Sequence, residues 1–246
     1  MLKNISTDIE YSGDPISARG QWSILSLWSC EVGNINNSFY SELQPINRHY
    51  NNEAMAVVSP WFKTIGDTTK MTPVQVLEAL KSHGKKPEEC FWDYAAWLEW
   101  FTDTKLREIA CPIKFDGWLK AYYFRMFADY NPLSFSWEDG NSMLRWFLND
   151  QNTSFSRLGI QQLWWGLPHN ALQDAQIQSI WIEFLLRLMK DNTESRGEIL
   201  SLYMREGKEK FLLASWVKEY TEWCRDTVSD IATTEFWKDV NYRSIL

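Results

Sequence analysis

The stretch Leu2-Lys-Asn-Ile-Ser-Thr-Asp8-Ile-Glu10 decides how the rest of the chain is interpreted. Its apolar and polar residues indicate a β-strand, and alternation along a strand places residues two apart on the same face of a sheet. Asp8 and Glu10 are therefore expected to point the same way. Two carboxylates on one face repel each other unless a cation lies between them, and Mg²⁺ and Mn²⁺ prefer oxygen ligands of this kind. The strand therefore predicts a metal site.

Three further residues, which come later in the chain, suit the same site. Asp116 precedes an apolar helical segment, and His169 is followed five positions later by Asp174. Each also has an ordinary alternative, because Asp116 is a good helix N-cap, Asp174 suits the first turn of a helix, and a lone loop histidine is usually solvated. The joint pattern favours a metal site with one proton acceptor.

The order and wording of these residues resemble the DEDDh branch of the 3′-to-5′ exonucleases, a family with the RNase H-like fold that includes ribonuclease T and polymerase proofreading subunits. Asp8-Ile-Glu10-Tyr-Ser-Gly13 is similar to the family's Asp-x-Glu-x-x-Gly, and Phe115-Asp116 to its second motif. His169-Asn-Ala-Leu-Gln-Asp174-Ala175 is similar to its His-x-Ala-x-x-Asp-Ala. The segment 111–114, Cys-Pro-Ile-Lys, departs from the small polar run that many relatives have there.

The resemblance implies an α/β fold over residues 1–190, with an RNase H-like mixed five-stranded sheet flanked by helices. It implies a metal-dependent 3′-5′ exonuclease that hydrolyses phosphodiester bonds at the 3′ end of DNA or RNA, with single strands favoured, and releases mononucleotides. Two Mg²⁺ or Mn²⁺ ions would be held by the four acids Asp8, Glu10, Asp116 and Asp174. His169 would accept a proton from the attacking water.

Aromatic residues are abundant, with 15 Trp, 10 Tyr and 13 Phe, and unpaired bases stack well on such rings. Tyr11 directly follows the first acidic pair and Trp165 lies just before His169, so both are candidates for substrate contact, together with Gly13 of the first motif. Most other rings are expected in the core. Four that recur at helical spacing predict a buried helix face: Trp92, Trp97, Trp100 and Phe101.

Net charge is −7, which argues against coating a long nucleic acid but leaves an enzyme that grips one chain end possible. Local basic residues could steer the strand, although ordinary solvated surface charge is the alternative for each. These candidates are Lys114, Lys120, Arg125 and Arg157.

Hydrophobic patterning predicts strands at about 2–10, 22–33, 37–45, 107–115 and 134–137, and helices at 73–83, 88–102 and 117–130. Residues 191–246 are expected to form a helical C-terminal extension that packs on the first domain, pairs with a second copy or docks a protein partner. A length of 246 residues and 45% hydrophobic content suit one main soluble domain.

The sequence also bears on location and on other function classes. The four cysteines are scattered and predict neither a zinc site nor a disulfide framework. The first residues show no signal pattern and no apolar segment is long enough to span a bilayer, so a cytoplasmic protein is expected. Two alternatives stay open: a catalytically degenerate fold that serves as a binding or scaffold module, and a proofreading or processing subunit of a larger complex.

Overall fold

The computed structural model describes residues 2–13, 22–101, 105–111, 113–133, 137–155 and 171–191. The strands are β1 (Leu2–Tyr11), β2 (Ile24–Glu31), β3 (Asn34–Glu42), β4 (Lys105–Ala110) and β5 (Trp137–Asp139). The helices are α1 (Asn52–Val58), the 3₁₀ turn η1 (Ser59–Trp61), α2 (Pro73–His83), α3 (Pro87–Glu99), α4 (Ile113–Phe127), α5 (Gly140–Leu148) and α7 (Ala171–Asp191).

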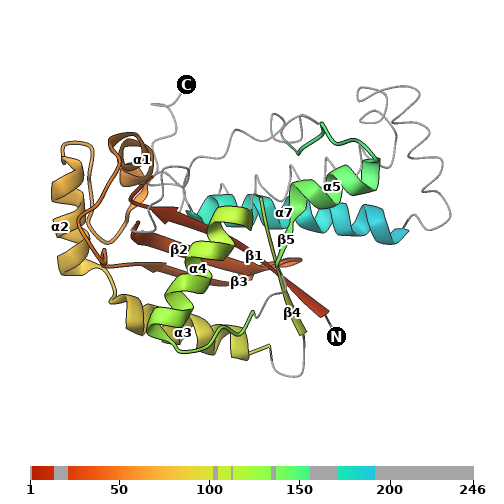
Figure 1. Cartoon of the computed structure of the whole chain (residues 1–246), viewed down its shortest axis with the longest axis horizontal. Coiled ribbons are helices and arrows are strands. Elements are labelled where there is room, and N and C mark those ends of the chain that lie inside the picture. The colour runs from red at the N-terminus through yellow and green to blue at the C-terminus, as the bar shows by residue number, and fades with distance from the viewer. Residues whose placement is uncertain are drawn as a thin grey trace. The chain divides into compact units, whose positions relative to one another are not determined.

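The five strands form one mixed sheet in the order β3-β2-β1-β4-β5 (Figure 1). β1 pairs antiparallel with β2 and parallel with β4, and β4 pairs parallel with β5. Parallel strands need a long crossover, and the segment with α1, α2 and α3 supplies it between β1–β3 and β4. The predicted mixed five-stranded α/β fold is confirmed, with β1 at its centre.

Local sequence explains how two of these elements begin and end. β2 and β3 are joined through Val32 and Gly33, and Gly33 has a φ of 86°, a conformation that glycine adopts without steric cost. Helix α2 begins at Pro73 after Thr72, whose side chain accepts from the Gln75 backbone while the Gln75 side chain accepts from the Thr72 backbone N–H. This reciprocal capping fixes the start of the helix.

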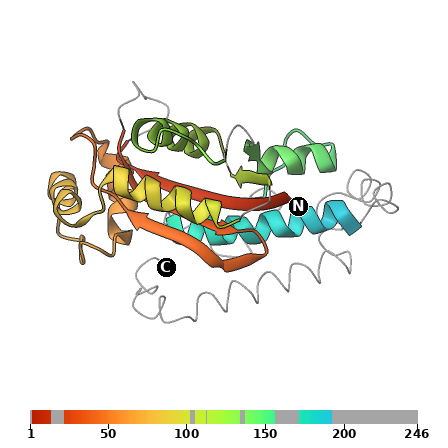
Figure 2. The ribbon, with the colours of Figure 1, turned by 90° about the horizontal axis from the view of Figure 1, so that it is seen from below.

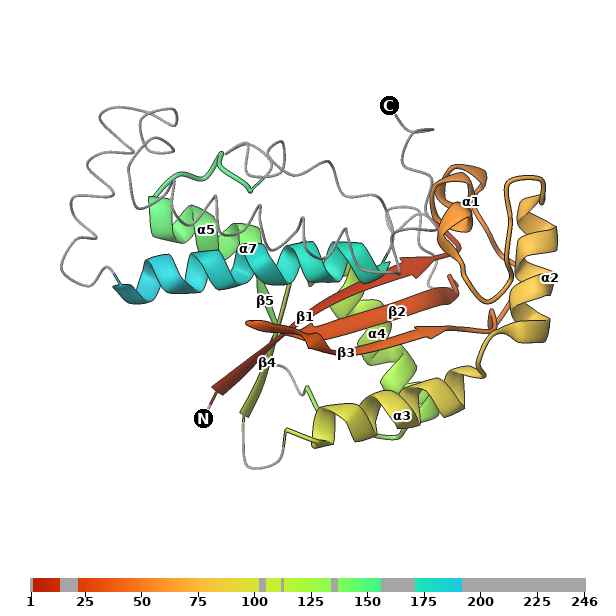
Figure 3. The ribbon, with the colours of Figure 1, turned by 180° about the vertical axis from the view of Figure 1, so that it is seen from behind.

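Helices cover both faces of the sheet. Ile5 and Ile9 of β1 pack with residues of α3 and α4 in the main hydrophobic core. Ser6, which points to the opposite face of β1, donates a 2.9 Å hydrogen bond to the carbonyl oxygen of Ala175 on α7. Figures 2 and 3 show α4 and the first part of α7 on opposite sides of the sheet. A side chain that follows Ser6 in the alternation therefore lies between the sheet and α7.

A second hydrophobic cluster lies at one end of the sheet. It joins Leu25 of β2 to apolar residues of α1 and α2, among them Met55, Val58, Val76 and Leu80. Burying these side chains attaches the α1–α2 segment to the sheet.

The chain divides into two compact units. Unit 1 comprises Met1–Met143 and Leu167–Ile182, and it contains the whole sheet and the first part of α7. Unit 2 comprises Leu144–Gly166 and Glu183–Leu246; in its described part, Arg145 donates from Nε to the carbonyl oxygen of Thr153 at 2.9 Å. The predicted boundary at residue 190 and the predicted C-terminal helical extension stay predictions, because residues 192–246 lie outside the described residues.

Several predicted boundaries differ from the structure: the strand predicted at 37–45 is Asn34–Glu42, and the helix predicted at 117–130 is Ile113–Phe127. β4 ends at Ala110 and α4 begins at Ile113, so the strand predicted to reach residue 115 is shorter and its last residues are helical. The fifth strand, predicted at 134–137, is Trp137–Asp139. Apolar residues on both sides of Pro112 hid the boundary, since a short apolar run does not distinguish a strand from a buried helix turn.

The prediction that four aromatic residues form a buried helix face was wrong for two of them. The buried face of α3 is built from Cys90, Phe91, Tyr94, Ala95 and Leu98. Trp92 is 47% exposed and Trp100, just after the helix, is 82% exposed, whereas Trp97 and Phe101 are half-buried against the core. The buried face thus includes the rings of Phe91 and Tyr94 but not those of Trp92 and Trp100, so the presence of an aromatic ring was a poor guide to burial.

The described cysteines are buried free thiols. Burial raises the pKa of Cys30 and of Cys90 to about 12, so both thiols stay protonated at neutral pH. Among the described helices, none combines the length and the hydropathy that a membrane span requires.

Candidate metal centre

Asp8 and Glu10 lie near the end of the central strand β1. Alternation places both side chains on the face that carries Ser6, which is the face covered by α7. Both carboxylates are half-buried. Their neighbours Ile5 and Ile9 point to the other face and anchor the strand in the main core. The predicted common orientation of the two acids is therefore what the packing of the strand imposes.

Asp174 reaches the same place from α7. It lies in the first turn of that helix and is only 3% exposed. The next residue, Ala175, is fully buried, and its carbonyl oxygen accepts from Ser6 Oγ at 2.9 Å and from Cys30 Sγ at 3.6 Å. Because a methyl side chain allows the helix to approach β1 closely, these contacts hold Asp174 directly over the strand.

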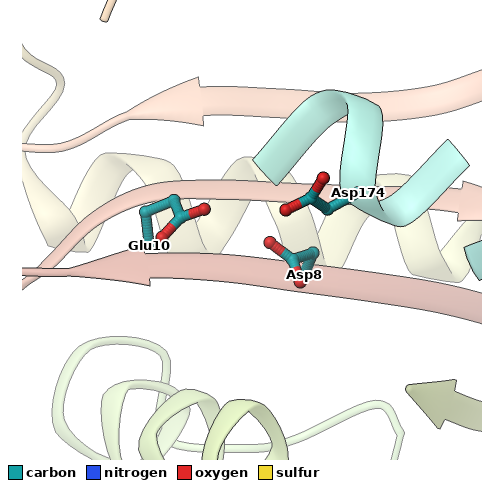
Figure 4. A group of neighbouring side chains, drawn as sticks. All are labelled: Asp8, Glu10 and Asp174. Atoms are coloured by element: carbon teal, nitrogen blue, oxygen red, sulfur yellow. The ribbon is translucent and has the colours of Figure 1, made fainter. Parts of the chain in front are cut away.

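The carboxylates of Asp8, Glu10 and Asp174 come together in one cluster. Each offers an oxygen that lies within 4.8 Å of the oxygens of the other two. Figure 4 shows the side chains from the strand and the helix pointing toward one another. Three anionic groups at this separation form a set of oxygen donors of the kind that binds Mg²⁺ or Mn²⁺.

Asp116 is the fourth acid of this region. It lies in the first turn of α4 and is 7% exposed. It is not a member of the three-carboxylate cluster, yet burial and the negative charges of Asp8 and Asp174 raise its pKa well above the usual range. A carboxyl group that responds to both charges lies close to the cluster, so all four acids predicted from the sequence act on one region.

The electrostatics of this region favour binding of a cation. Burial raises the pKa of Asp8 to about 7, against a hydrogen bond from Gln178 that lowers it. Burial and the charges of Asp8, Asp174 and Asp116 raise the pKa of Glu10. A divalent cation would remove this mutual repulsion and would favour the ionised forms. The residues present therefore fit the metal that the sequence predicted.

Gln178 belongs to this region and was missed by sequence analysis. Its Nε2 donates to Asp8 Oδ1 at 3.0 Å, and its Oε1 accepts from the backbone N–H of Cys111 at 2.9 Å. A signal existed, since Gln178 follows Asp174 by four residues and such residues lie on the same face of a helix. That spacing does not identify the partners of the amide, Asp8 and Cys111, which are distant in sequence.

The remaining predicted site residues have different placements. His169 and Trp165 lie outside the described residues. Tyr11 is the last residue of β1 and is half-buried against the main core. Gly13 is buried, and a Cβ atom there would lie 1.8 Å from the ring of Trp22, so this position needs glycine for close packing. Their roles toward a substrate stay predictions.

The basic residues proposed to steer a nucleic acid strand also differ in their placement. Lys120 is 1% exposed and forms an ion pair with the fully buried Glu108 of β4, so the expectation of a surface charge was wrong. Arg125 is exposed on α4. The side chain of Lys114 and all of Arg157 lie outside the described part of the chain. Lys120 was misjudged because helical lysines are rarely buried without a partner, and its partner is distant in sequence.

Comparison with known proteins supports the fold. No protein-family model matches the chain, and no curated protein matches it in sequence. Among solved structures, the chain is similar to the crystal structure of cell-death related nuclease 4 (CRN-4), with a TM-score of 0.53 and 10% sequence identity over 77% of this chain. The chain spans 64% of the length of that nuclease chain. The chain therefore shares its mixed α/β fold with a nuclease.

Proposed function

We propose that this protein is a metal-dependent 3′-5′ exonuclease that hydrolyses phosphodiester bonds from the 3′ end of a nucleic acid and releases mononucleotides. The observation that carries the proposal is the meeting of Asp8, Glu10 and Asp174, whose oxygens lie within 4.8 Å of one another. A cluster of like charges opposes folding unless a cation compensates it. Its presence on a fold shared with a nuclease supports hydrolysis of phosphodiesters as the purpose of the cation.

All four carboxylates would contribute to metal binding. Asp8, Glu10 and Asp174 would hold one Mg²⁺ or Mn²⁺ ion, and Asp116 with Asp8 would contribute to a second, as the resemblance implies. Such ions supply charge stabilisation for the attacking and leaving oxygens of a phosphodiester. The contribution of the chain is to fix the four side chains from β1, α4 and α7, three elements joined through the core and the Ser6–Ala175 contact.

His169 is the proposed proton acceptor. A histidine with a pKa near ~6.5 is largely neutral at pH 7 to 8, and the neutral imidazole can take a proton from the attacking water. It precedes Asp174 by five residues in the sequence and lies outside the described residues, so its role rests on the resemblance.

The proposed substrate is a single-stranded end of DNA or RNA. The net charge of −7 disfavours extended electrostatic contact with a duplex, whereas a chain end requires only local contacts. Tyr11, Gly13 and Trp165 are the residues proposed to meet its terminal nucleotides, by stacking or by close backbone approach.

The proposal is tested with purified full-length protein, Mn²⁺ and matched single-stranded DNA and RNA that carry a 5′ label. A 3′-to-5′ exonuclease shortens the labelled strand stepwise, whereas an enzyme that starts at the 5′ end releases the label at once. A 3′-blocked strand should resist degradation. Failure to degrade either strand, with Mn²⁺ bound, would leave the non-catalytic scaffold as the better account.

A matched pair of variants separates the cluster from general effects of charge. Asp8→Ala should abolish degradation. Asp93→Ala removes a carboxylate of the same type from the surface of α3, where it forms an ion pair with Lys85, and should keep the parent's rate. Equal losses in both variants would contradict a metal site at Asp8.

A further inference from the structure

Gln178 is a buried polar residue beside the proposed metal ligands. It lies on α7, is 1% exposed and follows Asp174 by one helical turn. Both ends of its amide are used, since Nε2 donates to Asp8 Oδ1 at 3.0 Å and Oε1 accepts from the Cys111 N–H at 2.9 Å. Rotating the amide by 180° would place its oxygen against a carboxylate and its NH₂ group against an N–H. The two partners therefore fix the orientation of the amide.

These two hydrogen bonds join the elements that supply the acids. Asp8 lies on β1, Gln178 and Asp174 on α7, and Cys111 directly between the end of β4 and the start of α4, which carries Asp116. One side chain thus contacts both a proposed metal ligand and the turn that leads to another. The Ser6–Ala175 bond links only β1 and α7, so Gln178 adds the connection to β4.

We propose that Gln178 is a positioning residue, which acts through Asp8 to hold the carboxylate in the orientation that binds the metal. This inference rests on the proposed function. A single hydrogen bond to Oδ1 restricts rotation of the Asp8 carboxylate about its terminal torsion, which is otherwise soft. Residues that orient metal ligands in this way contribute ~10–100-fold to metal affinity or activity.

A positioning role and a purely structural role for Gln178 predict different results for Mn²⁺ binding. Loss of a structural hydrogen bond lowers the temperature of unfolding but leaves the folded protein with its parental Mn²⁺ affinity. Loss of a positioning bond also weakens Mn²⁺ binding by the folded protein. At saturating Mn²⁺ the rate should recover most of its parental value, because the defect lies in occupancy of the site.

The test uses Gln178→Met in the full chain, because methionine has a similar length and removes both hydrogen bonds. Mn²⁺ affinity is measured by calorimetry and by electron paramagnetic resonance of free Mn²⁺, so that the result does not depend on activity. We expect affinity to fall ~10–100-fold. Gln178→Asn keeps the amide on a chain one methylene shorter, should lose affinity in the same direction, and decides the matter where the methionine variant folds poorly.

Gln176→Met is the matched control, since it makes the same change on the same helix at a half-buried position two residues earlier. It should retain the parental Mn²⁺ affinity. Parental affinity in folded Gln178→Met or Gln178→Asn would overturn the positioning role while leaving the metal site intact. A parent protein that binds no Mn²⁺ would overturn the proposed function together with this inference.

Discussion

Two groups of charged side chains lie in the same unit, and they differ in how their charges balance. The acidic group consists of Asp8, Glu10, Asp116 and Asp174, all of one sign. The other group is the ion pair of Lys120 and Glu108, which are 1% and 0% exposed in their side chains. The two groups are neighbours in the fold, because Asp116 and Lys120 are one turn apart on α4.

This difference in charge balance indicates different roles for the two groups. The two charges of an ion pair largely cancel, so the pair needs no external ion, and removing one member leaves an uncompensated buried charge that destabilises the fold. Carboxylates that raise one another's pKa repel each other when they are ionised, so they do not compensate each other's charge. Burial and neighbouring acids raise the pKa of both Glu10 and Asp116, so the cluster does not stabilise the fold by itself and is suited to bind a cation.

The largest effect should follow from removing a member of the acidic group. Asp8→Ala, Glu10→Ala, Asp116→Ala and Asp174→Ala should each nearly abolish 3′-end degradation, because each carboxylate would neutralise the charge of an ion needed in the transition state. Rates are measured on labelled single strands in Mn²⁺, and folding is checked by circular dichroism. Parental rates in two or more of these variants would sink the metal-site proposal.

A second activity effect distinguishes proton transfer from metal binding. His169→Ala should slow turnover by ~10²–10⁴-fold while Mn²⁺ affinity changes little, because the imidazole acts on the water. In the parent at saturating Mn²⁺, the rate should rise as pH passes through ~6.5, and this limb should be absent from the variant. A variant that keeps both the rate and the acid limb of the parent would place the proton acceptor elsewhere.

The ion pair should respond in the opposite way, in stability before activity. Lys120→Met leaves Glu108 buried without its cation and should lower the free energy of unfolding by about 3–5 kcal/mol, measured with urea in EDTA. Asp116→Asn, one turn away on the same helix, should instead raise it, since it removes one of several like charges. The contrast tests the two groups with adjacent substitutions.

The double variant Glu108→Leu/Lys120→Met serves as the control for this prediction. Replacing both members with apolar residues removes the charge that Lys120→Met leaves buried, so most of the lost stability should return. If the double variant is as unstable as Lys120→Met alone, the loss comes from packing and not from the broken ion pair.

The same contrast shows how far the sequence could predict this molecule. Alternation along residues 2–10 placed Asp8 and Glu10 on one face, and the structure confirms the mixed sheet around them. Such periodic signals are local, and the strand needs no distant partner to be recognised. The positions of Asp8 and Glu10 were therefore within reach of sequence analysis, whereas Asp116, predicted just after a strand, lies in the first turn of α4.

The contacts between residues that are distant in sequence could not be predicted in this way. Lys120 was expected at the surface because lysine is almost never enclosed without a partner, and Glu108 becomes its partner only when α4 packs on the sheet. Gln178 and Asp8 are 170 residues apart in the chain. Neither pairing has a local periodic signal, so both depend on the tertiary packing that the sequence patterns did not specify.

The smallest effect should be a change in the pH dependence of stability. In the folded, metal-free protein burial raises the pKa of Asp8 from 3.8 to about 7, so folding favours the protonated acid. Its contribution is fully present below the unfolded pKa and is lost as pH rises through about 7, so the free energy of unfolding in EDTA should decline over that range. Asp8→Asn cannot ionise and should show a smaller decline in urea titrations at pH 5, 6, 7 and 8.

Excess Mn²⁺ should raise the stability of the parent most at pH 8, where the carboxylates are ionised, and should not do so for Asp8→Asn. A parent whose stability is the same from pH 5 to 8, with and without Mn²⁺, would show that Asp8 is neither enclosed as an acid nor linked to a metal.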